Sequence, residues 1–485
     1  MTGLDLLAKT GSRGLFIGGQ WRESSTGARF QVLDPADESV ITDVADGDVR
    51  DAMAALDAAV AAQAEWAATP PRDRGEILRR AFEAITEQAD DFAELISLEM
   101  GKTLAEAKGE VTYGAEFFRW FSEEAVRIHG RWMQAPAGGS RLLTIRKPVG
   151  PCLFLTPWNF PLAMGTRKIG PAVAAGCTMV IKPAELTPLT MIALADVLTE
   201  AGLPPGVLNV ITTSDSKSLS KTLMADPRLR KVSFTGSTVV GKVLVRQSAD
   251  ELQRMSMELG GNAPFIVFED ADVEAAVNGA MIAKMRNMGE ACTAANRFLV
   301  HESVSRQFGE LLSARMGSLT TGRGQTPGTD VGPLINADAV TTVGQLVADA
   351  VQDGAEVLAG GSAPDGPGFF YSPTVLLGVR PESRVNTEEI FGPVAPITTF
   401  SSDDEAIALA NATEYGLASY VYTRDLARTV KVAEALQFGM VGINTGLVSN
   451  PAAPFGGVKA SGFGREGGFE GIEEYLDTTY VAIPG

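Results

Sequence analysis

The chain contains few histidines and few cysteines, and both shortages exclude classes of protein. Only two histidines occur among 485 residues, His129 and His301, and neither stands near another candidate ligand. We therefore expect no metal site and no histidine base. The three cysteines, Cys152, Cys177 and Cys292, are far apart and form no CxxC pair. This spacing excludes a disulfide framework and is typical of a protein of the reducing cytoplasm.

Positive charge and long apolar runs are also scarce. The chain carries 41 lysines and arginines against 59 aspartates and glutamates, a net charge of −18, and has no basic tract. Such a field repels phosphate backbones and anionic lipid, so we expect neither nucleic acid nor a membrane surface as a partner. Residues 1–21 lack the apolar core of a signal peptide, and no run approaches the length of a membrane span. An anionic small-molecule substrate would need a local cationic pocket.

What remains is the composition of a globular protein with more than one domain. At 485 residues, 45% of them hydrophobic, the chain is too long for a single hydrophobic core. Apolar spacing in the first part predicts a strand pair, 15–21 and 31–34, followed by helices over 48–68, 71–88 and 90–128. The N-terminal part is therefore predicted to be mostly helical.

From residue 151 onward, short apolar strands alternate with helices in two series. Strands of the first series are predicted at 152–155, 178–181, 207–211 and 231–234, with helices such as 187–201 and 238–248. Strands of the second series are predicted at 264–268, 296–300, 394–400, 419–422 and 440–444. This alternation predicts an α/β fold with two doubly wound domains, each a parallel sheet with helices on both faces. An isolated alternating strand at 141–146 predicts an edge that joins another sheet or subunit.

One cysteine and one carboxylate stand in settings typical of covalent catalysis. Cys292 lies in the polar, glycine-containing segment 287–293. Glu258 lies in the segment 257–262, and it precedes Cys292 by 34 residues. A thiolate is a strong nucleophile even when a small fraction is ionised, and a carboxylate can activate water as a general base. The pair predicts an enzyme that forms and hydrolyses a thioester. The alternative, a cysteine packed as a small hydrophobe, is disfavoured by the polar neighbours of Cys292.

A glycine turn at 234–241 predicts a nucleotide site. It directly follows a predicted strand and opens a helix, so backbone N–H groups can face a pyrophosphate, although a merely capped glycine turn is the alternative. Lys182 and Glu185 end an earlier strand and offer a cation and a carboxylate to a ribose. The segment 462–467 matches the GxGxxG fingerprint of dinucleotide-binding sites. We reject it as a phosphate-binding loop because no strand precedes it and no helix follows it within a βαβ unit.

Asn159 lies just beyond the first predicted parallel strand. In doubly wound sheets, sites form at this carboxyl end of the strands. The Asn159 amide could stabilise an oxyanion, or it could fix the turn between Pro157 and Pro161. The residues alone leave both interpretations open.

Taken together, the motifs resemble those of the NAD(P)-dependent aldehyde dehydrogenase superfamily. They recur in the family's order from about residue 15 to the C-terminus, at 157–161, 182–185, 234–241, 258–261, Cys292, 389–393 and 454–457. The resemblance implies two doubly wound α/β domains with a small β extension for oligomerisation, as a homodimer or homotetramer. The implied segments are 1–127 and 148–257 for NAD(P) binding, 258–463 for catalysis, and 128–147 and 464–485 for oligomerisation.

The resemblance also implies roles for individual residues. Cys292 resembles the nucleophile, Glu258 the base that activates the hydrolytic water, and Asn159 with the Cys292 N–H the oxyanion hole. The implied contacts to the cofactor are Trp158, Lys182, Glu185, Gly236, Ser237, Gly241, Glu389 and Phe391. Glu258 further separates the chain from the CoA-acylating branch, which typically lacks a glutamate at this position.

Arg167, Arg286 and Ser449 are similar to the residues that receive the far carboxylate in the succinate-semialdehyde dehydrogenase branch. Guanidinium groups match carboxylates bidentately, although a structural ion pair is the alternative for either arginine. The implied reaction is oxidation of succinate semialdehyde to succinate. Glutarate semialdehyde or another aliphatic or aromatic aldehyde is the alternative substrate, and a catalytically silent protein is the alternative class.

Three residues bear on regulation and cofactor choice. Ala294 occupies the place where many relatives in this branch have a second cysteine, which excludes a local disulfide. Glu290 occupies the place of the family's usual glutamine, and a carboxylate turned toward the thiol would disfavour the thiolate. Glu185 favours NAD, because a carboxylate accepts both ribose hydroxyls but repels a 2′-phosphate. NADP stays an alternative, since some relatives with this glutamate use it.

Overall fold

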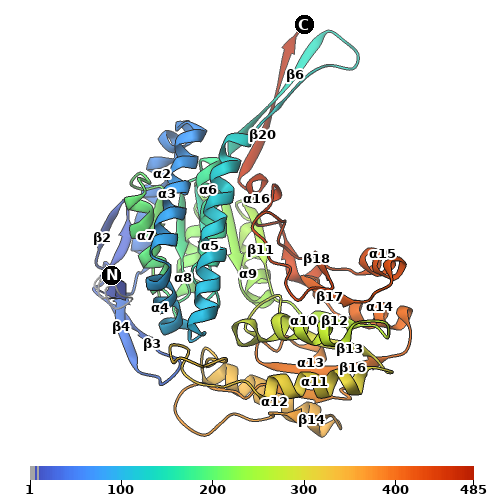
Figure 1. Cartoon of the computed structure of the whole chain (residues 1–485). Coiled ribbons are helices and arrows are strands. Elements are labelled where there is room, and N and C mark those ends of the chain that lie inside the picture. Colours follow the sequence, from blue (N-terminus) through green and yellow to red (C-terminus); the bar gives the residue numbers. More distant parts are fainter. Residues whose placement is uncertain (1–5, 8–9, 12) are drawn as a thin grey trace.

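The computed structural model describes residues 6–7, 10–11 and 13–485 and places them around two large sheets (Figure 1). The first sheet has eight strands. In order across the sheet they are β19 (Gly462–Phe463), β11 (Arg254–Glu258), β10 (Lys231–Thr235), β7 (Cys152–Leu155), β8 (Met179–Lys182), β9 (Leu208–Val210), β1 (Leu15–Ile17) and β2 (Gln20–Arg22). Strands β7 to β11 run parallel, and the outer strands β1, β2 and β19 are antiparallel to their neighbours.

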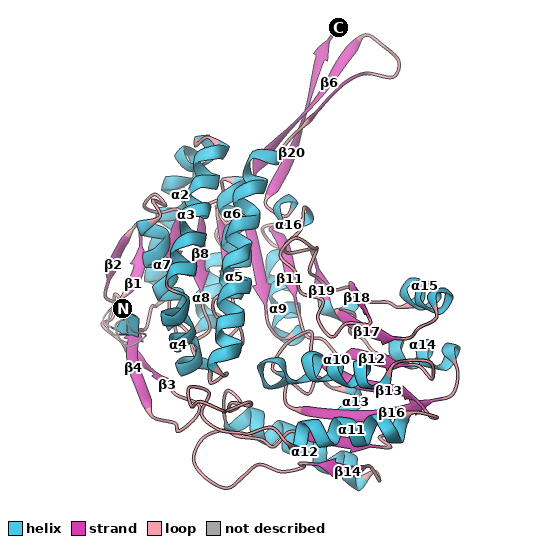
Figure 2. Cartoon of the chain, viewed as in Figure 1, coloured by secondary structure: helices cyan, strands magenta, loops and turns pink. Residues whose placement is uncertain are grey.

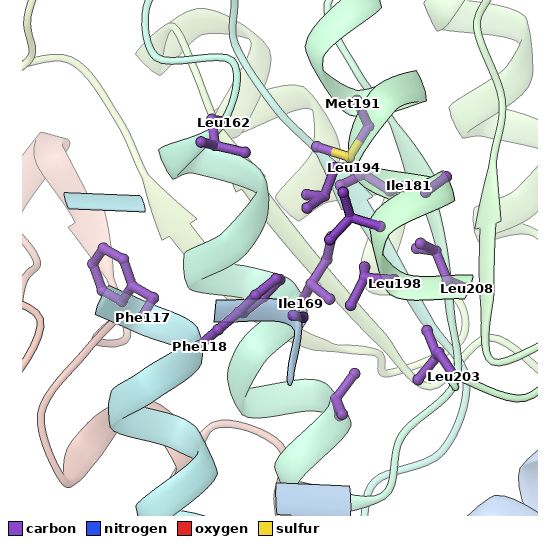
Figure 3. Packing of buried hydrophobic residues seen from close by; sticks show 14 of the residues in the cluster. Phe117, Phe118, Leu162, Ile169, Ile181, Met191, Leu194, Leu198, Leu203 and Leu208 are labelled. Carbon is purple, nitrogen blue, oxygen red and sulfur yellow. The ribbon is translucent and has the colours of Figure 1, made fainter. Parts of the chain in front are cut away.

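Helices cover both faces of this sheet. One face packs against α3 (Pro71–Glu87), α4 (Ala89–Met100), α5 (Leu104–Glu124), α6 (Ala163–Ala175) and α7 (Leu189–Glu200). The other face packs against α2 (Val49–Ala68), α8 (Ser216–Met224) and α9 (Thr238–Ser248). Successive residues of β7 alternate between the two cores: Cys152 and Phe154 join the first, Leu153 and Leu155 the second. In the first core, Phe118, Ile169 and Leu194 come together from α5, α6 and α7 (Figure 3).

The second sheet has seven strands and the same layered plan (Figure 2). Across the sheet they are β14 (Glu356–Ala359), β15 (Thr374–Leu377), β16 (Val394–Phe400), β13 (Ala295–His301), β12 (Ala263–Val267), β17 (Ala418–Tyr422) and β18 (Met440–Ile443), all parallel except β14. Its helices are α10 (Val273–Met285) and α11 (Ser305–Gly317) on one face, and α12 (Ala337–Gln352), α14 (Asp403–Asn411) and α15 (Leu426–Ala435) on the other. The predicted α/β class with two doubly wound sheets is confirmed.

Two smaller sheets and several short elements complete the chain. A hairpin pairs β3 (Arg29–Leu33) with β4 (Val40–Ala45). A three-stranded sheet has the order β20 (Leu476–Pro484), β6 (Ser140–Pro148), β5 (Arg131–Gln134). The short helices are η1 (Ala125–Arg127), η2 (Arg286–Gly289), α13 (Arg384–Thr387), η3 (Lys459–Ser461) and α16 (Glu470–Glu473). No helix in the described residues has the length and apolarity needed to cross a membrane.

Three predicted elements differ from the structure. The strand predicted at 15–21 is a hairpin, because Gly18 and Gly19 have φ of +62° and +79° and reverse the chain. The helix predicted over 90–128 is two helices: Gly101 ends α4 at φ +92°, and Thr103 opens α5 as a capping box with Glu106.

The strand predicted as an edge at 141–146 is the third difference. It belongs to β6, which pairs with β5 on one side and with β20 on the other, so it is the central strand of its sheet. The partner β20 comes from the other end of the chain, and no local pattern could reveal it. Strands β6 and β20 project together from the body, with the C-terminus at the tip (Figure 1).

Candidate active site

The carboxyl ends of the parallel strands of the first sheet face a cavity of about 230 Å³, here called the catalytic cavity. Most of the predicted catalytic and cofactor residues line it: Trp158, Asn159, Gly236, Ser237, Glu258, Cys292, Glu389 and Phe391. Asn159 follows β7, Gly236 follows β10, and Glu258 ends β11, whereas Cys292 precedes β13 of the second sheet. The two sheets therefore contribute to one site.

The backbone before Cys292 is strained. Asn287, Met288 and Gly289 have φ of +57°, +54° and +78°, so three successive residues adopt the left-handed conformation within η2. For the two residues with side chains this conformation costs free energy, and such strain concentrates at functional sites. Gly289 has no space for a side chain, because a Cβ there would lie 2.2 Å from the Gly392 carbonyl oxygen. The bend turns the chain from α10 toward Cys292.

The thiol of Cys292 is held in its protonated form. Burial raises the pKa of Cys292 to about 12; Glu258 and Glu389 add to the rise, and Arg167 and Arg286 oppose it. At that pKa, on the order of one thiol in 10⁵ is ionised at neutral pH. The group becomes a nucleophile only when a neighbour accepts its proton.

Glu258 is a buried carboxyl group with free oxygens. Among the described residues, neither of its carboxylate oxygens has a hydrogen-bond partner. Burial raises the pKa of Glu258 well above its usual value, Glu466 adds to the rise, and Arg167 and Lys168 oppose it. A carboxyl group with a raised pKa and no partner is suited to exchanging protons at neutral pH.

The side chain of Asn159 is held in one orientation. Its Nδ2 donates to the Glu290 carbonyl at 2.9 Å. Its own backbone carbonyl accepts from Lys102 Nζ at 2.8 Å and from Asn287 Nδ2 at 3.2 Å. Because an amide nitrogen carries two protons, one remains for a ligand in the catalytic cavity that Asn159 lines.

Lys102 is itself fixed by a buried ion pair. Its Nζ lies 2.6 Å from Glu110 Oε2, and both side chains are fully buried. Glu110 also accepts from the backbone N–H groups of Leu162 and Ala163 at 2.9 and 3.2 Å, where α6 begins. The loop that carries Asn159 is thus fastened to α5 and to the start of α6.

Glu290 faces the protein interior on the side of Ile335. Its Oε1 accepts from the Ile335 N–H at 3.1 Å. Burial raises the pKa of Glu290 well above its usual value; the Ile335 N–H and Lys102 oppose the rise, and Glu106 adds to it. In its neutral form the carboxyl group of Glu290 has the shape of the glutamine amide that the family resemblance implies at this position. The glutamate can therefore take the place of that glutamine.

The raised pKa of Glu290 predicts that the stability of the folded chain depends on pH. Since the folded chain holds this proton more tightly than the unfolded chain, stability falls as the pH rises above 4.5, the ordinary pKa of a glutamate. The loss is about 1.4 kcal/mol per pH unit until the folded-state pKa is reached. A Glu290→Gln variant lacks this loss, so we expect its melting temperature to exceed that of the wild type by a margin that grows as the pH rises above 5 and becomes constant above the folded-state pKa, measured calorimetrically. The exposed Glu382→Gln is the control, and a margin independent of pH would refute the account.

The glycine turn before α9 is built by close packing. A Cβ at Gly236 would lie 2.5 Å from the Phe234 ring, and one at Gly241 would lie 2.4 Å from Leu259. Ser237 caps α9, and its hydroxyl accepts from the Val240 N–H at 3.4 Å. The N-terminus of α9 therefore opens at the catalytic cavity without side-chain obstruction at Gly236. This arrangement fits an anionic pyrophosphate.

Aromatic and acidic groups form the other wall of the catalytic cavity. The rings of Trp158 and Phe391 meet edge to face, with centroids 5.4 Å apart. Glu389 Oε1 accepts from the Gly261 N–H at 2.9 Å, and burial raises the pKa of Glu389 to about 7. Lys284 opposes that rise and is itself buried, donating to Asn296 and to the Gly392 carbonyl at 2.9 and 3.1 Å.

Lys182 and Glu185 lie outside the lining of the catalytic cavity. Lys182 ends β8, and its Nζ is 3.2 Å from Glu185 Oε2. The side chain of Lys182 is buried and that of Glu185 is half exposed. The pair stands at the carboxyl edge of the first sheet, two strands from β10, where a bound nucleotide could reach both.

The predicted substrate residues separate into two environments. Arg286 and Ser449 line a second cavity of about 380 Å³, here called the distal cavity. Its other lining residues include Tyr113, Phe160 and Leu447 and two carboxylates, Glu106 and Glu110. Arg286 lies over the Phe160 ring at 5.0 Å and, within residues 13–485, has no salt-bridge partner. Arg167 lies instead in α6, ion-paired with Glu466 and 4.4 Å over the Phe455 ring.

Sequence reasoning missed several buried charges around the site, namely Lys102, Glu110, Lys168, Lys284 and Glu466. Lys168 Nζ donates to Ser233 Oγ at 3.0 Å and pairs with Glu466, which also pairs with Arg167. In the sequence these residues look like ordinary charges of helices and of the glycine-rich tail. Only the fold shows that they are buried together, beside Glu258 and Asn159. The part of the chain that the structure describes has no cluster of three or more histidine, cysteine or acidic side chains able to hold a metal.

Comparison with known proteins identifies close relatives. The chain is 61% identical over 433 residues to a succinate-semialdehyde dehydrogenase of Paenarthrobacter nicotinovorans, covering 89% of this chain and 96% of that protein. It is 47% identical over 467 residues to the succinate-semialdehyde dehydrogenase [NADP(+)] GabD of Escherichia coli, covering 96% and 97%. It is also 47% identical over 470 residues to a glutarate-semialdehyde dehydrogenase of Pseudomonas aeruginosa, covering 97% of each.

Solved structures agree with these relatives. A succinate-semialdehyde dehydrogenase from Burkholderia pseudomallei superposes with a TM-score of 0.97 at 46% identity, covering 98% of this chain and 99% of that one. The protein PnpE, solved in complex with nicotinamide adenine dinucleotide, superposes with a TM-score of 0.94 at 40% identity, covering 97% of each. The model of the aldehyde dehydrogenase family matches residues 21–481. The resemblance inferred from the motifs is confirmed, and the chain belongs to the aldehyde dehydrogenase family.

Proposed function

We propose that the protein oxidises succinate semialdehyde to succinate, with NAD as the preferred hydride acceptor and NADP as the alternative. The observation that carries the substrate is Arg286, a guanidinium without a salt-bridge partner in the described chain, in the distal cavity with the Ser449 hydroxyl. In a protein of net charge −18, an anionic substrate needs such a local cation. The names of two relatives given above support the same substrate.

Cys292, Asn159 and Glu258 are proposed to carry the covalent chemistry. The Cys292 sulfur bonds to the aldehyde carbon after losing its proton, for which Glu258 is the acceptor with free oxygens. The resulting oxyanion accepts from the uncommitted proton on Asn159 Nδ2 and from the Cys292 N–H. Loss of hydride from this thiohemiacetal leaves a thioester on Cys292.

The nicotinamide cofactor, when bound, supplies the hydride acceptor. Its proposed contacts are the turn with Gly236, Ser237 and Gly241 for the pyrophosphate, Lys182 and Glu185 for one ribose, and Glu389 for the other, with Trp158 and Phe391 beside the nicotinamide end. Hydrolysis then completes the reaction: Glu258, after releasing the Cys292 proton to solvent, takes a proton from water, and the hydroxide attacks the thioester carbon. The Cys292 sulfur leaves as a thiolate and recovers its proton from Glu258.

Glutarate semialdehyde is the second candidate substrate, because a relative of similar identity carries that name. Its chain is one methylene longer than that of succinate semialdehyde, and its carboxylate would meet the same Arg286. One methylene in a pocket changes kcat/KM by only about 10- to 200-fold. The two semialdehydes differ in chain length and share the charge, so the charge is tested first.

An Arg286→Ala variant tests the proposed substrate class. We expect it to lose about 1.5–3 kcal/mol of transition-state binding with succinate semialdehyde, roughly 10- to 150-fold in kcat/KM, because a charged hydrogen bond is removed. With butanal, which has the same chain length and no charge, we expect little change. Steady-state kinetics with both aldehydes measures the difference.

The exposed Arg315→Ala is the matched control, since it removes the same charge from a residue that does not line the distal cavity. We expect it to leave both substrates unaffected. Equal losses on both aldehydes in Arg286→Ala would contradict a carboxylate-binding role. A wild-type enzyme that prefers butanal would contradict the proposed substrate class itself.

We further propose that the protein is a cytoplasmic homodimer or homotetramer. Three cysteines without a disulfide support the reducing compartment. Oligomerisation is supported by the projecting sheet β5–β6–β20, on which Trp132 and Tyr480 are 61% and 59% exposed. The segments 128–147 and 464–485 are proposed to form the oligomer interface. The segments 1–127 and 148–257 are proposed to form the cofactor-binding domain, and the segment 258–463 is proposed to form the catalytic domain with Cys292.

A further inference from the structure

Tyr113 lines the distal cavity, and no step of the proposed mechanism uses its hydroxyl group. Tyr113 belongs to α5 and lines the cavity with Arg286 and Ser449. Its hydroxyl oxygen is buried and has no hydrogen-bond partner among the described residues. A buried hydroxyl without a partner is costly, and native proteins keep few of them. Its retention here therefore needs a ligand or another function.

The position of the Tyr113 ring is defined by its neighbours. It meets Phe117 edge to face, with centroids 5.0 Å apart, and packs against the cluster of Phe160 and Ala291. The guanidinium of Arg286 lies 5.9 Å from the centre of the Tyr113 ring. These contacts fix the ring and leave the hydroxyl as the free end of the side chain.

Two cations act on this hydroxyl, and the two carboxylates of the distal cavity have partners of their own: Glu106 accepts from the Asn287 N–H, and Glu110 pairs with Lys102. Burial raises the pKa of Tyr113 above 10, so the group is a proton donor at neutral pH; Arg167 and Arg286 act in the opposite direction, and Cys292 and Glu466 add to the rise. The hydroxyl thus lies within the influence of two guanidinium groups and of the nucleophile. An acceptor placed there would be drawn by cations and would satisfy a donor.

Arg167 is poorly placed to be the second cation of a carboxylate clamp. It pairs with Glu466, and Phe455 covers its guanidinium at 4.4 Å. Arg167 also does not line the distal cavity. Arg286 is the cation that the distal cavity leaves unmatched within the described chain, and a carboxylate has more lone pairs than Arg286 and Ser449 alone would satisfy.

We propose that the Tyr113 hydroxyl donates a hydrogen bond to the far carboxylate of the aldehyde, beside Arg286 and Ser449, and that it is a specificity-determining residue for ω-carboxylated aldehydes. This inference rests on the proposed function and adds a neutral donor to the cationic one. A phenol hydroxyl on a fixed ring is directional, so it selects for the position of the carboxylate as well as for its charge.

Tyr113→Phe is the test, because it removes only the oxygen. We expect kcat/KM for succinate semialdehyde to fall about 10- to 100-fold, chiefly through KM, while kcat/KM for butanal stays unchanged. The thermal stabilisation by succinate, the dicarboxylate product, is expected to weaken as well. Unchanged turnover of butanal shows that the variant is folded.

Tyr371→Phe is the matched control. The Tyr371 hydroxyl is also buried without a partner in the described chain, but it lies in the core beside α12. We expect this variant to match the wild type with both aldehydes. A Tyr113→Phe loss that is equal on both aldehydes, or no loss at all, overturns the inference and leaves the proposed function standing. A wild type without preference for the carboxylated aldehyde would instead overturn the proposed function.

Discussion

A Glu258→Gln variant is expected to release about one equivalent of reduced cofactor per active site and then to turn over about 10²- to 10⁴-fold more slowly than the wild type. The first turnover ends with the thioester, and forming it consumes no water. Every later turnover needs hydrolysis, for which the amide of glutamine cannot accept a proton. Stopped-flow absorbance at the reduced-cofactor band measures both phases.

The rate of that first turnover should depend on pH more steeply than in the wild type. With Glu258 replaced, the Cys292 thiol must ionise on its own, and burial, the main cause of its raised pKa, remains in the variant. Between pH 7 and pH 9 the ionised fraction rises about tenfold per pH unit, so the burst rate of the variant should rise nearly as steeply. In the wild type, the carboxylate accepts the proton and the dependence is shallower.

Two observations decide whether Glu258 acts as assigned. Intact-protein mass after the burst should show the acyl group on the variant, and Cys292→Ala should show neither the burst nor the added mass. If the variant has lost the burst entirely, Glu258 is required for a step that precedes thioester formation. An unchanged steady-state rate would remove it from the mechanism.

Much of the site could be predicted because its residues follow strand ends. Glu258 ends β11 and Asn159 follows β7. Because the two strands run parallel, both residues lie at the same edge of the sheet, which is where sites form in doubly wound sheets. Cys292 was harder to place from spacing, since it belongs to the second sheet and meets Glu258 only through the packing of two sheets. Family motifs connected the two residues, and the cavity they share agrees with that connection.

What could not be predicted depends on pairs that are distant in sequence. Lys102 lies just after α4, yet its Nζ reaches the backbone of Asn159, 57 positions later. Glu466 lies in the tail, yet it pairs with both Arg167 and Lys168 of α6. Each partner looks like a solvated charge when read locally, because its burial is produced by the fold. The same holds for β6, whose second neighbour comes from the C-terminal strand.

An Asn159→Ala variant is expected to lose about 10²- to 10³-fold in kcat, or about 2.7–4 kcal/mol of transition-state stabilisation. The second Nδ2 proton, which the Glu290 carbonyl leaves free, is proposed to donate to the oxygen that becomes negative during attack, so its loss affects the transition state more than the bound aldehyde. Succinate semialdehyde and butanal should therefore lose equally, in contrast to the selective losses expected for Arg286→Ala. Steady-state kinetics with both aldehydes measures this.

The size of the effect follows from how firmly the donor is held. Asn159 is fixed through the Glu290 carbonyl at 2.9 Å and through Lys102, which the buried pair with Glu110 immobilises. A donor already oriented before the reaction stabilises charge without a cost of reorganisation. The exposed Asn278→Ala is the control and should retain full activity. If Asn159→Ala raised KM and left kcat unchanged, the amide would be binding the ground-state aldehyde, and the oxyanion would have to rest on the Cys292 N–H alone.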